Sequence, residues 1–180
     1  TIVDTIMVGG LGPEAIGAVS VGGMLHFSIV IVGMGIFLGL DTLVSQAFGA
    51  GRLAEGRRCL VQALYLSVLV TPPLMLLQYN AADRLEAWGI SHEVAVLTVP
   101  YIRSMAWGTW PLMIYGAFRR YLQSVGSVRP VMVAIVSANL VNWGANKLLI
   151  GGGLGLPGLG VEGSGWSTTI ARIYMAAILI

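Results

Sequence analysis

The stretch AIGAVSVGGMLHFSIVIVGMGIFLGL, residues 15–40, contains no Asp, Glu, Lys or Arg over its 26 residues. A helix needs about 20 apolar residues to cross the hydrocarbon core of a bilayer, which is about 30 Å thick. The stretch therefore predicts a membrane-spanning helix with room to tilt. A Gly-rich link with Arg52, Arg57 and Arg58 follows it, and the rest of the chain repeats this pattern of apolar run and polar link.

Composition places the chain in a membrane rather than in water. Hydrophobic residues make up 56% of it and charged residues only 10%, with a mean hydropathy of +0.83, whereas soluble domains carry about 25% charged residues. We therefore expect an all-α membrane protein, a polytopic helical bundle. The net charge of +2 is too small to indicate a nucleic-acid partner. The single cysteine, Cys59, rules out an internal disulfide and a Cys-rich metal site.

Uncharged runs separated by polar or Gly-rich links predict about six transmembrane helices. We expect the first and last to be truncated, because the chain begins at Thr1 rather than Met and stops inside an apolar run. Pro72 and Pro73 fall within the third run, where proline removes backbone hydrogen bonds and kinks a helix. Residues 151–160 are too rich in Gly and Pro to be helical. The expected spans are 1–10, 15–44, 59–82, 94–118, 130–150 and 163–180.

Basic residues gather in alternate links. The links after the second and fourth spans hold six arginines, whereas the other links hold only Arg84, with Lys147 close to a helix end. Loops rich in Lys and Arg lie on the cytoplasmic side of a membrane, so we expect these two links to be cytoplasmic. The six arginines are Arg52, Arg57, Arg58, Arg119, Arg120 and Arg129.

Asp4 stands in the apolar string IVDTIMV at residues 2–8. A central carboxylate in a bilayer costs about 2.5 kcal/mol or more on insertion scales and therefore needs a reason. One interpretation is a carboxylate inside the bundle that exchanges a proton for a cation, since burial favours the protonated form and a nearby cation favours the charged form. The other is a carboxylate near a helix start that local backbone groups satisfy.

Asn139, Asn142 and Asn146 recur at i, i+3 and i+7 in the fifth span. This spacing places them along one face of a helix. Amide oxygens can bind cations, and amide nitrogens can hold a carboxylate. A single asparagine would be explained by a hydrogen bond between membrane helices, but three on one face favour a binding site.

Other polar residues in the apolar runs have simpler explanations. We expect Arg103 to reach toward the membrane surface or to pair with a carboxylate, and Asp41 to bind Arg57 or backbone amides. A lone histidine such as His26 is more often a packing residue than a proton relay. Gln78 falls near the end of its run, which predicts a position at the membrane interface.

The stretches that resemble enzyme motifs in this sequence are incomplete or unspecific. HEVAV at residues 92–96 lacks the second histidine of a zinc-protease helix, and any Gly-rich turn produces the GSG of residues 163–165. The glycines of residues 151–160 lie between two expected spans, so they do not indicate a nucleotide-binding loop. We expect no enzyme, no organic cofactor and no structural metal.

Three stretches together resemble the bacterial branch of the multidrug and toxic compound extrusion (MATE) transporters. VDTIMVGGLG at residues 3–12 resembles the first-helix signature of that family, and LDTLVSQAFGAG at residues 40–51 resembles the end of its second helix. Asn142, Asn146 and the stretch GVEGSGWST at residues 160–168 resemble its fifth helix and the start of its sixth. The resemblance follows the family order along nearly the whole chain.

This resemblance implies a twelve-helix antiporter of two six-helix lobes, in which residues 1–180 would be one incomplete N-terminal lobe. Such proteins export amphipathic or cationic drugs across the cytoplasmic (inner) membrane of bacteria, driven by the inward flow of sodium ions or protons. The expected partners are therefore these drugs, membrane lipid and the second lobe of the same chain. Sodium at the cation site is the one metal ion that we expect.

The resemblance also implies roles for single residues. Asp4 matches the coupling carboxylate of the first helix, and Asn142, Asn146 and Thr168 fall at positions that complete the cation site. Many relatives have Asp where this sequence has Asn146, so this site carries one negative charge fewer. The coupling ion, sodium or proton, therefore stays open.

Asn139, Trp143 and Arg103 are candidates for lining the substrate path. Two alternatives to drug antiport stay open. A lipid-linked oligosaccharide flippase of the same superfamily would need a groove rich in basic residues, and Arg103 is the main intramembrane cation that we identify. A non-transporting membrane subunit would have no reason to keep Asp4 and the asparagine face.

Overall fold

The computed structural model describes residues 2–152 and 158–180, and the regular elements among them are all helical. The all-α prediction is therefore confirmed. Thr1 and residues 153–157, which belong to the expected Gly-rich link, lie outside the described residues. The elements are α1 (Ile2–Val8), η1 (Gly9–Leu11), α2 (Pro13–Ile36), α3 (Leu38–Gly49), α4 (Leu53–Ala82), η2 (Glu86–Trp88), α5 (His92–Trp107), α6 (Thr109–Ser124), α7 (Arg129–Ile150) and α8 (Gly160–Leu179).

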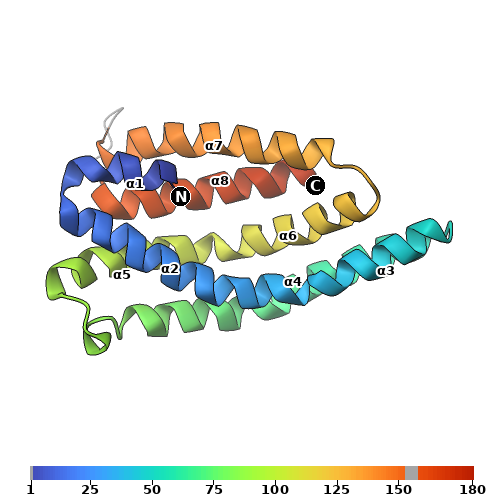
Figure 1. The fold of residues 1–180 in the computed structure, drawn as a ribbon, viewed down its shortest axis with the longest axis horizontal. Helices are drawn as coiled ribbons and strands as arrows, with labels where there is room; N and C mark the ends of the chain where they lie inside the picture. Colours follow the sequence, from blue (N-terminus) through green and yellow to red (C-terminus); the bar gives the residue numbers. More distant parts are fainter. Residues whose placement is uncertain (1, 153–157) are drawn as a thin grey trace.

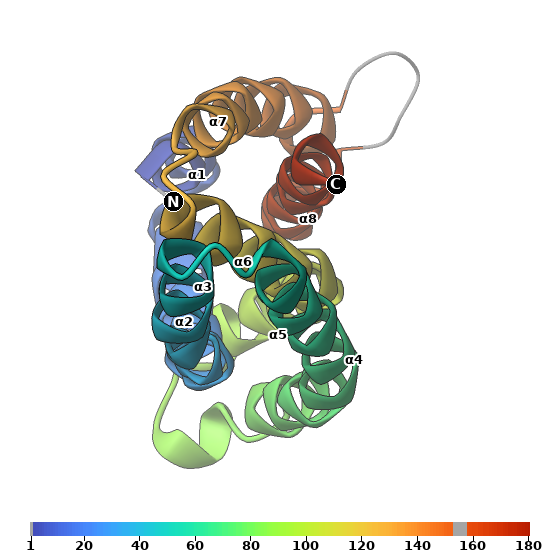
Figure 2. The same cartoon turned by 90° about the vertical axis from the view of Figure 1, so that its right-hand side faces the viewer.

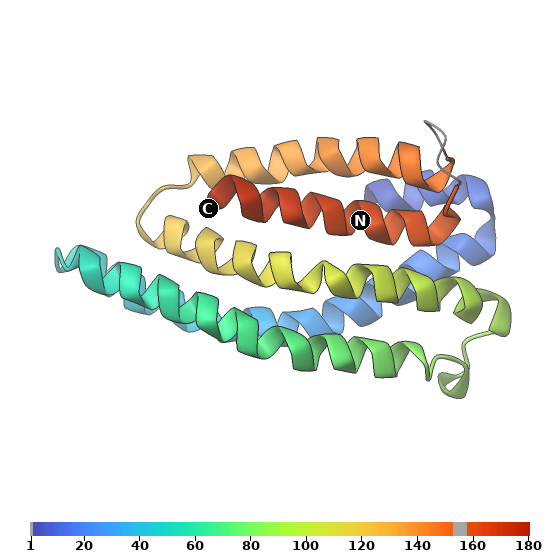
Figure 3. The same cartoon turned by 180° about the vertical axis from the view of Figure 1, so that it is seen from behind.

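The helices run back and forth along one direction and lie side by side (Figure 1). The α3–α4 and α6–α7 links lie at the same end of the bundle, and η1 and the α4–α5 link lie at the other (Figure 3). Of the six arginines, Arg52 lies in the α3–α4 link, and the other five lie in the adjoining parts of α4, α6 and α7. Seen from one end, α1, α7 and α8 lie on one side of α6, and α2, α3 and α4 lie on the other (Figure 2). The bundle therefore has two halves that meet along α5 and α6.

Among the described residues, three helical stretches are long and apolar enough to cross a membrane. They are residues 13–49, 53–82 and 129–150, with mean hydropathies of 2.2, 1.9 and 1.2. Large apolar side chains on these stretches point outward, among them Met24, Leu69 and Leu140, which are 73%, 73% and 69% exposed. An exposed apolar surface of this kind belongs in contact with lipid. The chain is a multi-pass membrane protein, as its composition predicts.

Prolines affect two of the long helical stretches differently. The expected span 94–118 is divided into α5 and α6 at Gly108. Pro111 explains this interruption, because it has no N–H to donate to the carbonyl group of Trp107. Pro72 and Pro73, in contrast, lie inside α4, which continues through them as one helix.

Close helix contacts at glycine hold α2 and α8 against α5. A Cβ atom at Gly165 of α8 would lie 2.9 Å from the carbonyl oxygen of Tyr101 and would overlap the hydroxyl group of Ser104. A Cβ atom at Gly22 of α2 would lie 2.7 Å from Cδ1 of Tyr101. Small residues let membrane helices approach this closely. These contacts fix the positions of the polar side chains that α8 presents to the interior.

Candidate functional site

Four polar side chains from three helices meet inside the bundle. They are Asp4 of α1, Asn142 and Asn146 of α7, and Thr168 of α8, and we call them the Asp4 cluster. Asp4 and Asn146 are completely buried, while Asn142 is 5% and Thr168 6% exposed. The structure thus brings together the four residues to which the sequence comparison assigned a common cation site.

Each oxygen of the Asp4 carboxylate accepts a hydrogen bond within this cluster. Asn146 Nδ2 donates to Asp4 Oδ1 at 2.7 Å, and Thr168 Oγ1 donates to Asp4 Oδ2 at 3.4 Å. Asn146 Nδ2 also donates to Asn142 Oδ1 at 3.2 Å, and Asn142 Nδ2 donates to Thr168 Oγ1 at 3.5 Å. The four side chains close a ring in which Asp4 only accepts, an arrangement that suits an ionised carboxylate.

The local sequence explains why these groups meet. Asn142 and Asn146 are one helical turn apart, so their amides lie on the same face of α7. α8 can approach this face because residue 163 is glycine. A Cβ atom at Gly163 would lie 2.5 Å from the carbonyl oxygen of Leu149 on α7. α1 contacts both α7 and α8, which places Asp4 beside the amides and the Thr168 hydroxyl.

One atom of the cluster, Oδ1 of Asn146, is buried and has no hydrogen-bond partner in the part of the chain that the structure describes. Leaving a buried polar atom without a partner costs about 1–3 kcal/mol, so such atoms call for an explanation. With the Asp4 carboxylate, Asn142 Oδ1 and Thr168 Oγ1, this atom completes a set of oxygen ligands. Hard cations prefer oxygen ligands of this kind.

A cavity of about 190 Å³ between α7 and α8 borders the Asp4 cluster. Asn142 and Thr168 line this cavity, together with Asn139 and Arg172, whereas Asp4 and Asn146 are not among its lining residues. Over residues 2–152 and 158–180, His, Cys, Asp and Glu side chains nowhere gather in threes to form a candidate metal site.

A second buried polar group, which we call the His26 cluster, joins α2, α4 and α6 through His26, Gln78 and Thr109. His26 Nδ1 lies 2.6 Å from Gln78 Oε1, and Gln78 Nε2 donates to Thr109 Oγ1 at 3.0 Å. Because an amide oxygen can only accept, His26 carries its proton on Nδ1. Its Nε2 atom is buried and lacks a hydrogen-bond partner among the described residues. His26 thus has one hydrogen bond, to Gln78, which connects α2 to α4.

The prediction that Gln78 lies at the membrane interface is wrong. Its side chain is fully buried and connects His26 to Thr109. A periodic signal was available, because Ser67, Thr71 and Gln78 recur at i, i+4 and i+11 and are all buried on one face of α4. Three polar residues on one face of an otherwise apolar helix indicate the side that packs inward.

The three candidates for a substrate path lie outside the Asp4 cluster. Asn139 lines the adjacent cavity and donates a hydrogen bond to the carbonyl of Ile135 on its own helix at 2.9 Å. Trp143 is 53% exposed on the surface of α7. Arg103 pairs with Asp83 at 2.9 Å, and both side chains are at least half exposed. The expectation that Arg103 finds a carboxylate is confirmed, and that carboxylate is not Asp4.

Asp41 also has a partner other than the expected one. It forms an ion pair with Arg120 of α6, so the prediction that it binds Arg57 is wrong. The reason is that α3 packs against α6 as well as α4. Helix packing of this kind cannot be read from the distance along the sequence. The pair joins two helices near the arginine-rich end of the bundle.

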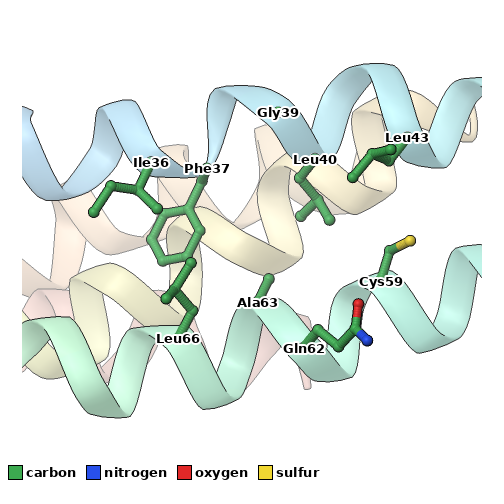
Figure 4. A pocket seen from close by; sticks show the side chains of 9 residues that line it. All are labelled: Ile36, Phe37, Gly39, Leu40, Leu43, Cys59, Gln62, Ala63 and Leu66. Carbon is green, nitrogen blue, oxygen red and sulfur yellow. The ribbon is translucent and has the colours of Figure 1, made fainter.

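A separate cavity of about 330 Å³ lies between the α2–α3 junction and α4 (Figure 4). No charged side chain lines it, and Gln62 is the one amide on its wall. This cavity therefore lacks the groups that a cation site needs. Its lining residues are Ile36, Phe37, Gly39, Leu40, Leu43, Cys59, Gln62, Ala63 and Leu66.

Known proteins resemble this chain along almost its full length. Residues 1–147 match the model of the MatE family. The chain is 31% identical over 179 residues to a probable multidrug resistance protein NorM of Bradyrhizobium diazoefficiens, covering 98% of this chain and 38% of that protein. It is 32% identical over 176 residues to the same-named protein of Geobacillus kaustophilus, covering 97% of this chain and 39% of that protein. The chain thus spans less than half the length of these relatives.

Solved structures share the fold. An outward-facing multidrug resistance MATE family transporter superposes with a TM-score of 0.88 at 22% identity, covering 99% of this chain and 39% of that one. The inward-facing conformation of such a transporter gives a TM-score of 0.86 at 21% identity, covering 98% of this chain and 40% of that one. The same helical arrangement therefore matches structures of both conformations.

Proposed function

The chain belongs to the MatE family, and from this premise we propose that it forms one lobe of a cation-coupled multidrug exporter. A second lobe completes the transporter, because the relatives that match the chain are more than twice as long. The relatives named as multidrug resistance proteins support drug efflux as the function. The six arginines at one end of the bundle support an orientation with that end in the cytoplasm of a bacterium.

The observation that carries this proposal is the burial of the Asp4 carboxylate among neutral oxygen ligands. Asp4 is completely buried, and the unpartnered Oδ1 of Asn146 lies in the same cluster. An intramembrane carboxylate is costly, and in membrane proteins it marks ion pathways and proton relays. We infer that a proton or a sodium ion binds here and exchanges against drug export.

Binding of the cation has a direct structural consequence at these residues. The two donors that now face the carboxylate, Asn146 Nδ2 and Thr168 Oγ1, must turn away when a cation takes their place, because amide and hydroxyl hydrogens repel it. Turning the Asn146 amide brings its unpartnered oxygen toward the cation. The hydrogen bonds of the cluster therefore differ between the cation-bound and the cation-free state. Because these bonds connect α1, α7 and α8, cation binding changes the contacts of all three helices. A ligand can shift a conformational equilibrium only through such differential contacts.

The proposal is tested with the complete transporter in proteoliposomes, using ethidium as a fluorescent organic cation. An inward sodium gradient and an inward proton gradient are applied in separate experiments, so that the coupling ion is identified. We expect gradient-driven ethidium export by the wild type and its reduction to the background of empty liposomes by Asp4→Asn, because the amide carries no negative charge. Asp41→Asn is the matched control, since Asp41 pairs with Arg120 outside the cluster, and it should still export ethidium.

Two results would contradict the proposal. Export by Asp4→Asn at the wild-type rate under either gradient would show that the carboxylate is not the coupling group. Equal loss of export by Asp41→Asn would show that removal of any intramembrane carboxylate harms the protein, without a special role for Asp4.

A further inference from the structure

Arg172 places a positive charge inside the bundle, on α8 one helical turn beyond Thr168. Its side chain lines the cavity between α7 and α8 that also reaches Asn142 and Thr168. An intramembrane arginine is costly and calls for a functional explanation.

The end of α5 holds the Arg172 guanidinium in place. Gly108 N donates to Met105 O at 3.0 Å where α5 ends, and Arg172 Nη1 lies 3.4 Å from the same carbonyl oxygen. The neighbouring carbonyl of Ser104 accepts a hydrogen bond from Thr169 Oγ1 of α8 at 2.8 Å. The carbonyl end of a helix carries partial negative charge and attracts a cation. The interruption at Gly108 therefore creates the place in which this arginine rests.

The absence of a side chain at Gly108 lets Arg172 approach the α5–α6 junction closely. A Cβ atom at this glycine would lie 3.1 Å from both Cδ and Nη1 of Arg172 and 2.7 Å from Thr169 Oγ1. The arginine is thus packed against the backbone of this junction.

Arg172 lies one helical turn from Thr168, whose hydroxyl donates to Asp4 Oδ2 at 3.4 Å, and it interacts electrostatically with Asp4 of α1, Tyr101 of α5 and His26 of α2. Asp4 is the partner that matters for cation binding, because the net charge at this carboxylate changes when a cation binds. The charge of Arg172 favours the Asp4 carboxylate in its unoccupied state. The same charge repels a cation that approaches through the shared cavity.

We propose that Arg172 is the internal counter-charge that sets the cation affinity of the Asp4 cluster. It keeps the carboxylate stable without a bound cation, so that the cation can leave when the transporter releases it. Arg172 is a positioning residue in this scheme, since it acts on the cation through the field at Asp4 rather than as a ligand. This inference rests on the cation-binding role proposed for Asp4.

The test measures sodium binding to the complete, detergent-solubilised transporter by isothermal titration calorimetry. Measurements are made at alkaline pH, where protons compete least, and at constant ionic strength. Arg172→Gln removes the charge, and we expect its dissociation constant for sodium to fall about tenfold, which is one unit on a logarithmic scale. Arg172→Lys keeps the charge and should bind sodium within about threefold of the wild type, which is half a unit on the same logarithmic scale.

Two further variants serve as a substitute and a control for this test. Arg172→Met keeps the apolar stem of the side chain and replaces Arg172→Gln if the glutamine variant does not fold. Arg103→Gln is the matched control, because it removes an arginine that pairs with Asp83 away from the cluster, and its sodium affinity should stay unchanged. If Arg172 has only a structural role, all three Arg172 variants should bind sodium more weakly than the wild type. If Arg172 is the counter-charge, Arg172→Gln and Arg172→Met alone should bind sodium more tightly.

Sodium binding by the Asp4 and Arg172 variants distinguishes a failure of the counter-charge inference from a failure of the proposed function. If Asp4→Asn abolishes sodium binding but Arg172→Gln and Arg172→Met bind sodium no more tightly than the wild type, the counter-charge is wrong and the role of Asp4 stands. If Asp4→Asn binds sodium as the wild type does, the proposed function itself fails. Tighter binding by Arg172→Gln together with wild-type affinity in Arg172→Lys supports both.

Discussion

The Asp4 cluster and the His26 cluster are both buried, and each connects three helices through hydrogen bonds between side chains. They differ in charge and access. The Asp4 cluster contains a carboxylate and borders a cavity of about 190 Å³, whereas the His26 cluster consists of an imidazole, a carboxamide and a hydroxyl group. The comparison separates two uses of polar groups in a membrane. A neutral network holds helices together, and a charged one next to a cavity has the groups that our proposed cation site requires.

Replacing Asn146 breaks the charged cluster and should have the largest effect. Asn146→Leu removes the 2.7 Å hydrogen bond to Asp4 and the amide oxygen that we propose as a cation ligand. Loss of a hydrogen bond to a buried charged group costs about 2–3 kcal/mol, so we expect ethidium export in proteoliposomes to slow by about 100-fold. Asn80→Leu is the control, because Asn80 is exposed and donates to Leu76 O on its own helix. Similar rates for the two variants would contradict this role of Asn146.

Replacing Gln78 breaks the neutral cluster and should reduce stability while leaving coupling intact. Gln78→Leu leaves His26 and Thr109 without their partner, and we expect the free energy of unfolding to fall by about 1–3 kcal/mol. Thermal unfolding in detergent measures this, with the exposed Gln62→Leu on the same helix as the control. The cation concentration that gives half-maximal export should not change. A marked change would mean that the two clusters are one functional unit.

Replacing Arg103 tests the arginine outside both clusters and should have the smallest effect. Its exposed ion pair with Asp83 contributes about 0–1 kcal/mol to stability. We therefore expect Arg103→Gln to unfold at nearly the wild-type temperature and to export ethidium at the wild-type rate. A loss of export without a loss of stability would place Arg103 on the substrate path, and the comparison would then need a third polar region.

Much of the fold follows from sequence because a membrane limits the choices. Apolar runs of sufficient length must be helices, since backbone polar groups find no water in the bilayer core. The spacing of Asn142 and Asn146 on one helix face was likewise available from the sequence. Their meeting with Asp4 came from family resemblance, because nothing in the order of residues states which helices are neighbours.

The contributions of Gln78 and Arg172 could not be predicted in the same way. α4 is apolar on most of its surface, so the sequence indicates its inward face only through three polar residues, Ser67, Thr71 and Gln78. The position of Arg172 depends on the interruption at Gly108, which exposes the Met105 carbonyl to α8. A one-residue interruption of a helix changes which backbone groups are available for hydrogen bonds with other helices. The pattern of apolar residues in the sequence does not predict such an interruption. Asp41 shows the same limit, since its partner Arg120 belongs to a helix distant in sequence.

Two consecutive threonines connect α8 to helices on different sides. The hydroxyl of Thr168 donates to the carboxylate on α1, while that of Thr169 donates to the Ser104 carbonyl near the end of α5. Rotation of α8 about its axis would change both hydrogen bonds together. The two threonines therefore link the positions of α1 and α5 through one helix.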